Sequence, residues 1–233
     1  LHYFYFCLSF SFIKMIIKIK RFLPAILMLM AGSVLITSCG RKSPDSFFKN
    51  GNAKYQLKDY NGAIKELDRA IELKPGFVHA YHTRAMCYGE LKQYEKALPD
   101  FNKAIELDPN FKNAYLNRAY YVKVNTGDYS SAIEDYNKFI ELNTEGNNAF
   151  ALNNRGFAKF NLNDTIGALQ DIQSSISMDS TNSYAFKNRA LIFISLDSIN
   201  LACRDIKKAL QLGYTKAYDN QVLLLEDKYC KPE

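Results

Sequence analysis

From residue 44 onward, apolar residues recur at spacings of three and four, and short polar stretches separate the apolar segments. This spacing places apolar side chains on one face of a helix, while the polar stretches mark the turns between helices. Residues 63–75 and 97–109 align without a gap at a distance of 34 residues. A period of this length predicts stacked helical hairpins rather than one compact core.

The period divides the chain into five units, each expected to form a helix, a turn and a second helix. We set the units at 44–77, 78–111, 112–148, 149–182 and 183–216. Small residues recur at two positions of the unit, where they allow the paired helices to approach closely. They are Gly51, Ala85, Ala119, Gly156 and Ala190 at the eighth position, and Ala63, Ala97, Ala132, Ala168 and Ala202 at the twentieth. No unit can bury its apolar stripe alone, so we expect the five to stack into one continuous core.

The third unit is longer than the others. We place one extra residue near 125–127 and two more near 145–148, and expect both insertions to lie in loops. After the fifth unit, residues 216–230 are expected to form one helix that caps the last apolar edge. This cap and the tail make up the terminal segment 217–233.

Two charged positions also recur. Arginine stands at the seventh position of the last four units and aspartate at the twenty-third, whereas the first unit has Asn50 and Glu66 there. A planar guanidinium can bond a carboxylate through two parallel hydrogen bonds. We therefore expect a structural arginine–aspartate pair between helices, either within a unit or across the junction between units.

Composition narrows the possible functions. The chain is 48% hydrophobic and 23% charged, which is typical of a folded protein. Lys14, Lys18, Lys20 and Arg21 account for +4 of the net charge of +6, so residues 39–233 carry only +2 and show no basic stripe. We therefore expect no nucleic-acid partner.

The motifs of common active sites are missing from the sequence. It has only three histidines, and it contains no Gly-x-Ser-x-Gly sequence, phosphate-binding glycine loop or dinucleotide fingerprint. Five repeats also leave no room for a separate catalytic domain. The sequence therefore predicts a protein that is not an enzyme and that needs no cofactor.

The beginning of the chain has the form of an export signal. Residues 15–21 are cationic, residues 22–36 carry no charge, and small residues follow. Fifteen helical residues span about 22 Å, less than the roughly 30 Å of a bilayer core, so cleavage is favoured over a transmembrane helix. Residues 1–14 do not begin with Met, and we interpret them as translated upstream sequence. The leader is thus 1–38, with its signal peptide at 15–38.

The repeats resemble the tetratricopeptide repeat (TPR) family, most clearly where Asn-Arg-Ala or Asn-Arg-Gly recurs at 117–119, 154–156 and 188–190. This resemblance implies an all-α, right-handed α-solenoid of about five helix-turn-helix units with a C-terminal capping helix. It also implies a concave wall formed by the first helix of each unit. Members of the family act as protein-binding scaffolds, so we expect a non-catalytic adaptor.

The end of the leader, Leu-Ile-Thr-Ser-Cys-Gly at 35–40, resembles the lipobox of bacterial lipoproteins. The resemblance implies that Cys39 receives a diacylglycerol and becomes the new N-terminus, followed by a short linker to residue 43. Because Gly40 is not an aspartate, it also implies a Gram-negative outer membrane, with the periplasmic or the surface-facing side left open. The alternative is an ordinary signal peptide with an incidental cysteine.

The concave wall is expected to collect rings and amides, a combination that suits a bound peptide because rings bury area and amides bond its backbone. Two alternatives stay open, namely a carrier or sensor of a small ligand, metal or glycan, and an accessory subunit of an envelope enzyme. The candidate groove residues are Asn52, Tyr55, His79, His82, Met86, Asn113, Tyr120, Lys123, Asn153, Phe157, Phe160 and Lys187.

Two further groups of residues each have two interpretations. Cys203 and Cys230 form a disulfide in an oxidising compartment or remain two buried thiols. His79, His82 and Met86 share one helix face and suit a soft metal, but we favour a polar groove wall and predict no metal site.

Three loops begin with Asp-Thr-Ile, Asp-Ser-Thr and Asp-Ser-Ile, at residues 164, 179 and 197. They resemble the O-glycan acceptor of exported Bacteroides-group proteins. The alternative, which we favour, is that these residues cap helices and form turns.

Overall fold

The computed structural model describes residues 43–217 and 220–230, and their regular structure is helical throughout. The chain divides into two units, Leu1–Ser43 and Pro44–Glu233. The predicted leader, Cys39 and most of the linker belong to the first unit and lie outside the described residues. Within the described part, no helix is both long enough and apolar enough to cross a membrane.

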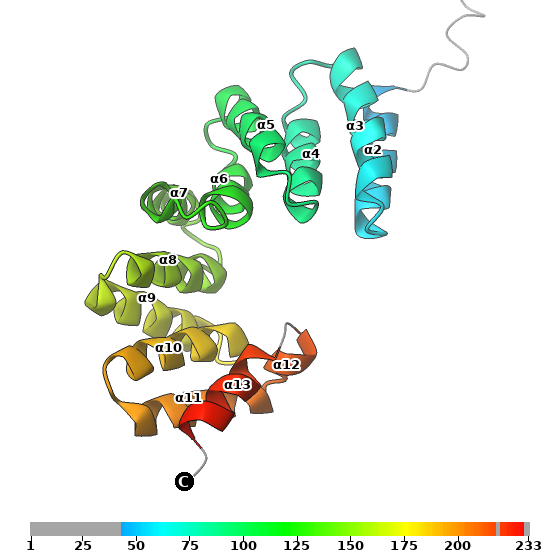
Figure 1. Cartoon of the computed structure of the whole chain (residues 1–233). Coiled ribbons are helices and arrows are strands. Elements are labelled where there is room, and N and C mark those ends of the chain that lie inside the picture. The colour runs from blue at the N-terminus through cyan, green and yellow to red at the C-terminus, as the bar shows by residue number, and fades with distance from the viewer. Residues whose placement is uncertain (1–42, 218–219, 231–233) are drawn as a thin grey trace, which may run out of the picture. The chain divides into compact units, whose positions relative to one another are not determined.

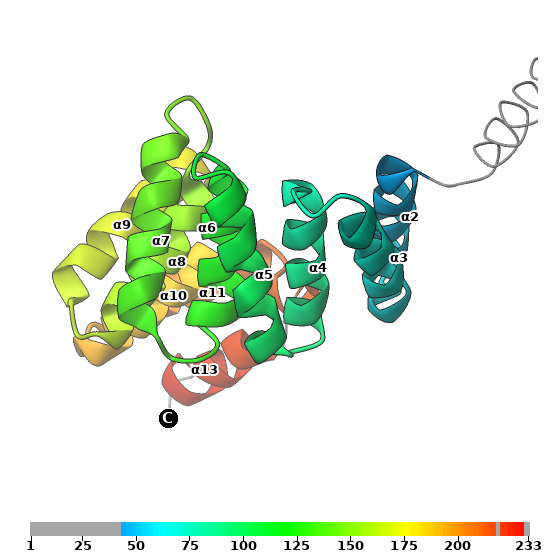
Figure 2. The ribbon, with the colours of Figure 1, turned by 90° about the horizontal axis from the view of Figure 1, so that it is seen from above.

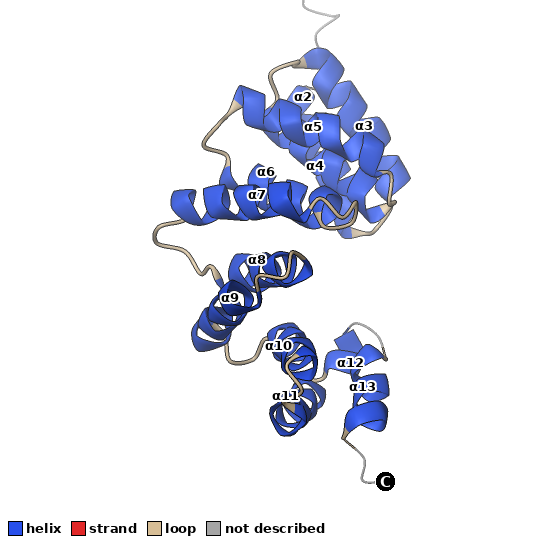
Figure 3. Cartoon of the chain, turned by 60° about the vertical axis from the view of Figure 1, so that its left-hand side comes forward, coloured by secondary structure: helices blue, strands red, loops and turns tan. Residues whose placement is uncertain are grey.

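The second unit is a series of helical hairpins, and the predicted all-α solenoid is confirmed. Each predicted repeat contains one hairpin, and the hairpins follow one another in chain order (Figures 1 and 2). Short loops join their helices (Figure 3). The helices are α2 (Pro44–Gln56), α3 (Tyr60–Leu73), α4 (Val78–Glu90), α5 (Tyr94–Leu107), α6 (Lys112–Arg118) with the π-helix η1 (Ala119–Lys123), α7 (Tyr129–Leu142), α8 (Ala149–Asn161), α9 (Thr165–Met178), α10 (Ser183–Ser195), α11 (Ile199–Gln211), α12 (Tyr214–Ala217) and α13 (Gln221–Tyr229).

Small side chains bring the two helices of a hairpin together. A Cβ atom added at Gly51 would lie 2.8 Å from Leu67 Cγ, and one added at Gly156 would lie 2.7 Å from Ile172 Cγ1. The five alanines of the twentieth position are fully buried. The predicted close approach of the paired helices therefore rests on direct contacts at these positions.

The turn inside each hairpin has the same backbone form in all five units. The residue two places before the second helix has a positive φ, between 55° and 77°, as is common where a helix ends and the chain reverses. These residues are Lys58, Lys92, Gly127, Asn163 and Asp197.

The extra residue of the third unit lies inside a helix, and the prediction that it lies in the loop near 125–127 is wrong. Gly127 stands at the same turn position as Lys58 and Lys92, and its amide donates to the carbonyl three residues back as theirs do, so the turn itself has the usual form. The insertion is instead absorbed by η1, where the Val124 amide donates to the Ala119 carbonyl five residues back at 3.0 Å. A π-turn of this kind accommodates one additional residue within a helix. The second insertion does lie in a loop, between the end of α7 at Leu142 and the start of α8 at Ala149.

The recurring arginines each hold the aspartate of their own unit. In the second unit, Arg84 Nε and Nη2 on α4 donate to the two carboxylate oxygens of Asp100 on α5, both at 2.7 Å. The later units repeat this bidentate pair as Arg118–Asp135, Arg155–Asp171 and Arg189–Asp205.

The remaining nitrogen of each arginine reaches back to the second helix of the preceding unit. Arg84 Nη1 donates to Asp68 Oδ1 on α3 at 2.6 Å. The predicted arginine–aspartate pair therefore forms within a unit, and the contact across the junction uses a different residue, at the twenty-fifth position of the unit. The same contact to the preceding unit joins Arg118 to Asn102, Arg155 to Asn137 and Arg189 to Gln173.

The cap differs from the single helix expected over 216–230, because α12 and α13 are separate helices. A straight helix of fifteen residues would run about 22 Å in one direction. The break instead lets α13 pack against α11, which buries Val222. A disulfide between Cys203 on α11 and Cys230 fastens the end of α13 to the last repeat.

Two of the Asp-Ser/Thr loops use their aspartates locally. Asp164 caps α9 by accepting from the Gly167 amide at 2.9 Å, and Asp179 accepts from both the amide and the hydroxyl of Thr181. These contacts are the capping and turn roles that we favoured for the sequence.

We call the four arginine–aspartate pairs the arginine ladder. The burial of these pairs predicts strong coupling between the two partners of each pair. Removing Arg118 or Asp135 alone leaves the other charge nearly buried without its counterion, so R118M and D135L should each lower the free energy of unfolding by about 3 kcal/mol. The double variant should lose much less than the sum of the two, because neither charge then remains. Urea unfolding of the four proteins measures this coupling.

The exposed pair Lys138–Glu141 serves as the control. Its removal should change the free energy of unfolding by no more than about 0.5 kcal/mol. Additive effects of R118M and D135L would contradict the proposed role of the ladder.

Candidate functional site

The first helices of the repeats form the concave wall. Neighbouring first helices touch, as α2 with α4, α4 with η1 and α8 with α10, whereas the described second helices of neighbouring repeats hardly touch. Because the inner elements of a curved stack lie closer together than the outer ones, the first helices line its inner side.

A cleft of about 280 Å³ opens on this wall and spans the second to fifth repeats. We call it the aromatic cleft, because five of its eleven lining residues are tyrosine or phenylalanine. Polar groups lie among the rings, including the Glu90 carboxylate and the amides of Asn125 and Asn154. Its lining is Gly89, Glu90, Lys92, Tyr94, Tyr120, Tyr121, Val124, Asn125, Asn154, Phe157 and Tyr184.

The rings in and beside the aromatic cleft pack against one another. Tyr120 packs against Tyr121 edge to face with 5.0 Å between ring centroids, and its ring also lies 5.4 Å from that of Phe150. Tyr120 and Phe150 are 42% and 47% exposed, so part of each ring is open to solvent. The aromatic cleft thus offers apolar faces that a ligand can cover.

The π-helix η1 sets the position of Tyr121. The ring of Tyr121 lies over Gly89 on α4, where an added Cβ would come within 2.6 to 2.9 Å of the ring and of Tyr121 Cβ. The other four repeats have Tyr55, Val124, Phe160 and Ile194 at the position of Gly89. The glycine of the second repeat therefore makes room for the tyrosine that the inserted residue of the third repeat displaces.

Tyr121 is also part of a polar chain across the first three repeats. Its hydroxyl donates to Glu90 Oε1 at 2.7 Å and lies 3.5 Å from the hydroxyl of Tyr55. Burial, followed by the hydrogen bonds with Tyr55 and Glu90, raises the pKa of Tyr121. The phenol stays protonated at neutral pH and is a hydrogen-bond donor rather than a nucleophile.

The structure distributes the predicted groove residues unevenly. Tyr120 and Phe157 line the aromatic cleft, and Tyr55 reaches its edge through Tyr121. Lys123 pairs with Asp128 at 3.4 Å, and Phe160 packs against the C-terminal core. Exposed side chains elsewhere are Asn52, His79 and Asn113, and Met86 is half-buried.

Three predicted groove residues lie in the interior, which corrects the expectation that they face a ligand. His82, Asn153 and Lys187 are 8%, 1% and 4% exposed. The repeat gives each residue its position along its own helix, but the first helix of the neighbouring repeat covers these side chains.

His82 makes its contacts within this wall. The Asn117 amide nitrogen of the next repeat lies 2.9 Å from His82 Nε2 and donates to Met86 Sδ at 3.2 Å. The rings of Phe101 and Phe111 pack edge to face against the imidazole. Burial lowers the pKa of His82 to about 4, although a hydrogen bond with the Asn113 backbone opposes this change.

A second buried contact joins the fourth and fifth repeats. The Asn188 amide donates to Asn153 Oδ1 at 3.0 Å, and Lys187 Nζ donates to Asn188 Oδ1 at 3.3 Å. Lys187 Nζ also lies 4.7 Å from the ring centroid of Tyr184 and 5.9 Å from that of Phe157 on the fourth repeat. Asn153 and Lys187 therefore join repeats rather than offer groups to a ligand.

The side chains of the metal alternative, His79, His82 and Met86, make other contacts in the structure. The Asn117 amide nitrogen lies within hydrogen-bond distance of His82 Nε2, and the His79 ring lies near the rings of Phe48 and Phe111. Among the described residues, no group of three or more His, Cys, Asp or Glu side chains could hold a metal ion.

Sequence reasoning missed Tyr121, Glu90, Asn125, Asn154 and Tyr94. The signal for Tyr121 was the extra residue of the third repeat, which we assigned to the loop. Placed inside the helix, the insertion moves Tyr121 to the position of Met86 and Phe157, which are groove positions.

Comparison with known proteins agrees with the repeat architecture. Sequence models of the tetratricopeptide repeat match residues 44–77, 78–111 and 113–145. Residues 44–145 carry tetratricopeptide repeats. The helical hairpins of residues 149–211 continue the same TPR architecture beyond these matches. No curated protein matches the chain significantly.

Solved structures share the fold at low sequence identity. PilW, described as a widely conserved type IV pilus biogenesis factor, has a TM-score of 0.73 and 18% identity over 82% of this chain and 86% of its own. MamA of Desulfovibrio magneticus RS-1 has a TM-score of 0.66 and 13% identity over 75% of this chain and 97% of its own. YrrB, described as a TPR protein with an unusual peptide-binding site, has a TM-score of 0.62 and 19% identity over 78% of this chain and 91% of its own.

Acid should destabilise the TPR wall through His82. Its pKa is about 4 in the folded protein and near 6.5 when unfolded, so the unfolded chain takes up a proton first as the pH falls. The stability is fully present above pH 6.5 and decreases between pH 6.5 and 4, by at most about 3 kcal/mol. Urea unfolding at pH 7 and pH 4.5 measures the loss.

H82Q removes the titrating group, so this variant should lose less stability between pH 7 and pH 4.5 than the unmodified protein does. H79Q is the matched control, because His79 is exposed, and it should keep the full acid sensitivity. Equal acid losses in H82Q and the unmodified protein would remove His82 as the cause.

Proposed function

We propose that this protein is a non-catalytic interaction scaffold that binds a peptide segment of a partner protein in the aromatic cleft. The observation that carries the proposal is the cleft itself, which brings partly exposed rings, amides and a carboxylate together on the concave TPR wall. Rings bury apolar side chains of a peptide, and the polar groups bond its backbone.

The chemistry of the aromatic cleft supports binding rather than turnover. Tyr121 keeps its proton, and its hydroxyl hydrogen-bonds to Glu90. Cys87 is fully buried, and burial raises the pKa of its thiol to about 12, so it is a core residue rather than a nucleophile. The peptide-binding site described for YrrB, which shares the fold, is a precedent for such a role.

We further propose that the protein is a lipoprotein of a Gram-negative, Bacteroides-like cell, held at the outer membrane through a lipid on Cys39. Support comes from the lipobox-like sequence at 35–40 and the export signal before it. The Cys203–Cys230 disulfide supports the same location, because disulfides persist in oxidising compartments such as the periplasm and the cell surface. Two or three acyl chains give stable attachment to a bilayer.

A photoreactive side chain tests the scaffold. Benzoylphenylalanine in place of Tyr120, which lines the aromatic cleft and is 42% exposed, should capture a protein partner when intact cells are irradiated. The F157A variant should lower the yield of this adduct at least five-fold, because it removes a second ring of the aromatic cleft. Mass spectrometry of the adduct identifies the partner.

The matched control places the same group at Ile166, which is 72% exposed on the second helix α9. Identical adducts from both positions would show non-specific capture and contradict the cleft. A thermal shift with small molecules but no protein adduct at Tyr120 would favour the carrier alternative.

The anchor has its own test, independent of the aromatic cleft. C39A should abolish incorporation of a labelled palmitate and move the protein from the membrane fraction to the soluble fraction, because only a thiol forms the thioether. C87A, which changes a buried cysteine, should keep both the label and the membrane location. A C39A protein that is still labelled and membrane-bound would refute the lipid anchor.

A further inference from the structure

The second helix of the last repeat breaks a charge pattern that the first three repeats follow. There, an exposed cation at the twenty-sixth position pairs with a glutamate three residues later, as Arg69–Glu72, Lys103–Glu106 and Lys138–Glu141. In α11 the cation is Lys208, and the residue three positions later is Gln211. The cation of the pattern is kept, and its carboxylate partner is replaced by a neutral amide.

A second position of α11 also differs from the earlier repeats in the direction of more positive charge. In each earlier repeat, Asp68, Asn102, Asn137 or Gln173 accepts a hydrogen bond from the arginine of the next repeat. The corresponding residue of α11 is Lys207, a cation in place of an acceptor. Arg204 lies one turn before it, so Arg204, Lys207 and Lys208 stand at i, i+3 and i+4 on one exposed face.

The structure provides these three cations with no counterion within the described residues. Asp205, the acidic residue of α11, has a side chain that is only 2% exposed and already binds Arg189 through both oxygens. Like charges at these spacings repel one another. An anion bound from outside would remove this repulsion.

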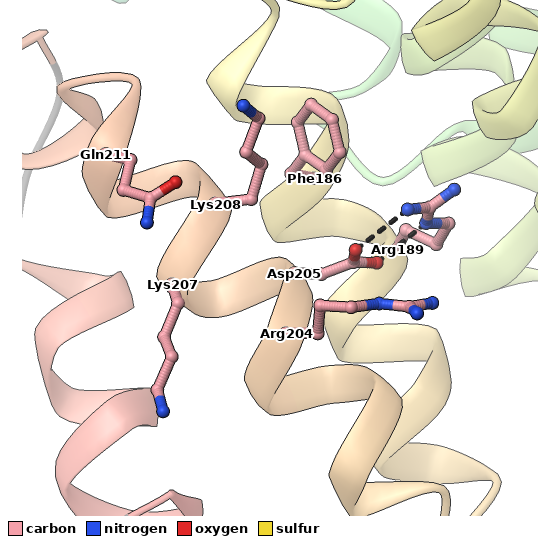
Figure 4. A pocket seen from close by; sticks show the side chains of 7 residues that line it. All are labelled: Phe186, Arg189, Arg204, Asp205, Lys207, Lys208 and Gln211. Atoms are coloured by element: carbon pink, nitrogen blue, oxygen red, sulfur yellow. Dashed lines mark hydrogen bonds and ion pairs between the residues drawn. The ribbon is translucent and has the colours of Figure 1, made fainter.

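Two hollows flank the cationic face. One, of about 440 Å³, lies between α10 and α11 and is lined by all three cations, by Phe186 and Gln211, and by Arg189 and Asp205, which are bonded to each other (Figure 4). In the view of Figure 4, the Lys208 side chain extends to the side of α11 on which Phe186 lies, whereas Lys207 extends to the other side. The second hollow, of about 580 Å³, is lined by Arg204, Lys207 and Tyr229. Both volumes lie in the range of small-ligand sites.

We propose that this face of α11 binds a phosphate-bearing ligand, with Arg204 and Lys208 on the phosphate oxygens and Phe186 against the rest of the molecule. A phosphate concentrates nearly two negative charges and three acceptor oxygens on one group, which suits two cations one helical turn apart. The carboxylates of an acidic peptide are spread along its chain and match this spacing less well. The guanidinium fork of Arg204 can bind two phosphate oxygens at once.

This site is separate from the aromatic cleft, since it lies on a second helix and uses none of the cleft residues. The same phosphate chemistry has two sources, a soluble phosphorylated compound and the headgroup of an anionic lipid. The experiment needs an arm for each source.

The first arm titrates the purified full-length protein with inorganic pyrophosphate by calorimetry at low ionic strength. The unmodified protein should bind it, and the double variant R204Q/K208Q should bind it at least ten-fold more weakly. The matched control K103Q/K138Q removes the same total charge at paired positions of the second and third repeats, and should bind within two-fold of the unmodified protein.

The second arm replaces pyrophosphate with vesicles of phosphatidylglycerol and phosphatidylcholine, or of phosphatidylcholine alone, using C39A in every protein so that no acyl anchor contributes. Vesicle flotation that needs phosphatidylglycerol and is lost in R204Q/K208Q assigns the site to a lipid headgroup. Binding of pyrophosphate alone assigns it to a soluble ligand.

Two results would overturn the proposal. One is that the unmodified protein binds neither probe. The other is that R204Q/K208Q and K103Q/K138Q weaken binding equally, which is the effect of net charge rather than of a site. Circular dichroism of each variant confirms that its helices are intact.

Discussion

The close approach of the two helices in each hairpin is the constraint on which the rest of the structure depends. At Gly51 and Gly156, even one methyl group would lie within 2.8 Å of the facing helix, and the alanines of the twentieth position are fully buried. Close pairing leaves an apolar edge that only the next hairpin can cover, so the repeats stack. Stacking in turn brings the first helices together as one wall and fixes what that wall can offer to a ligand.

The fold was predictable because its signals are local. Spacings of three and four, small residues at fixed positions and an Arg–Asp pair in four repeats each belong to one hairpin or to one junction. The cleft was less predictable, because it depends on contacts between hairpins. The repeat places His82 and Asn153 on the inner side of their helices, and only the neighbouring first helix shows that they are buried. Tyr121 was missed because one residue was assigned to a loop instead of to η1.

The recurring Asn-Arg pair has a physical explanation in these junctions. The arginine bonds the aspartate of its own repeat and the second helix of the repeat before, as Arg118 does with Asp135 and Asn102. The asparagine beside it bonds the first helix of the repeat before. Asn117 contacts His82 in this way, and Asn188 contacts Asn153 at the same separation of 35 residues. One dipeptide thus contacts both the first and the second helix of the preceding repeat.

The junction between the third and fourth repeats lacks the asparagine hydrogen bond between first helices. The aromatic cleft spans this junction. Its asparagine, Asn154, donates instead to the Phe150 carbonyl of its own helix, because the residue that would face it on the third repeat is Leu116. The first helices hardly touch here, and the longest loop between described hairpins, 143–148, also lies at this point. With the inner contact absent, η1 and α8 stand apart enough to leave Tyr120, Asn154 and Phe157 on the surface of a cleft. The departures from the repeat pattern therefore coincide in space, and together they turn an ordinary helical junction into a site that can hold a ligand.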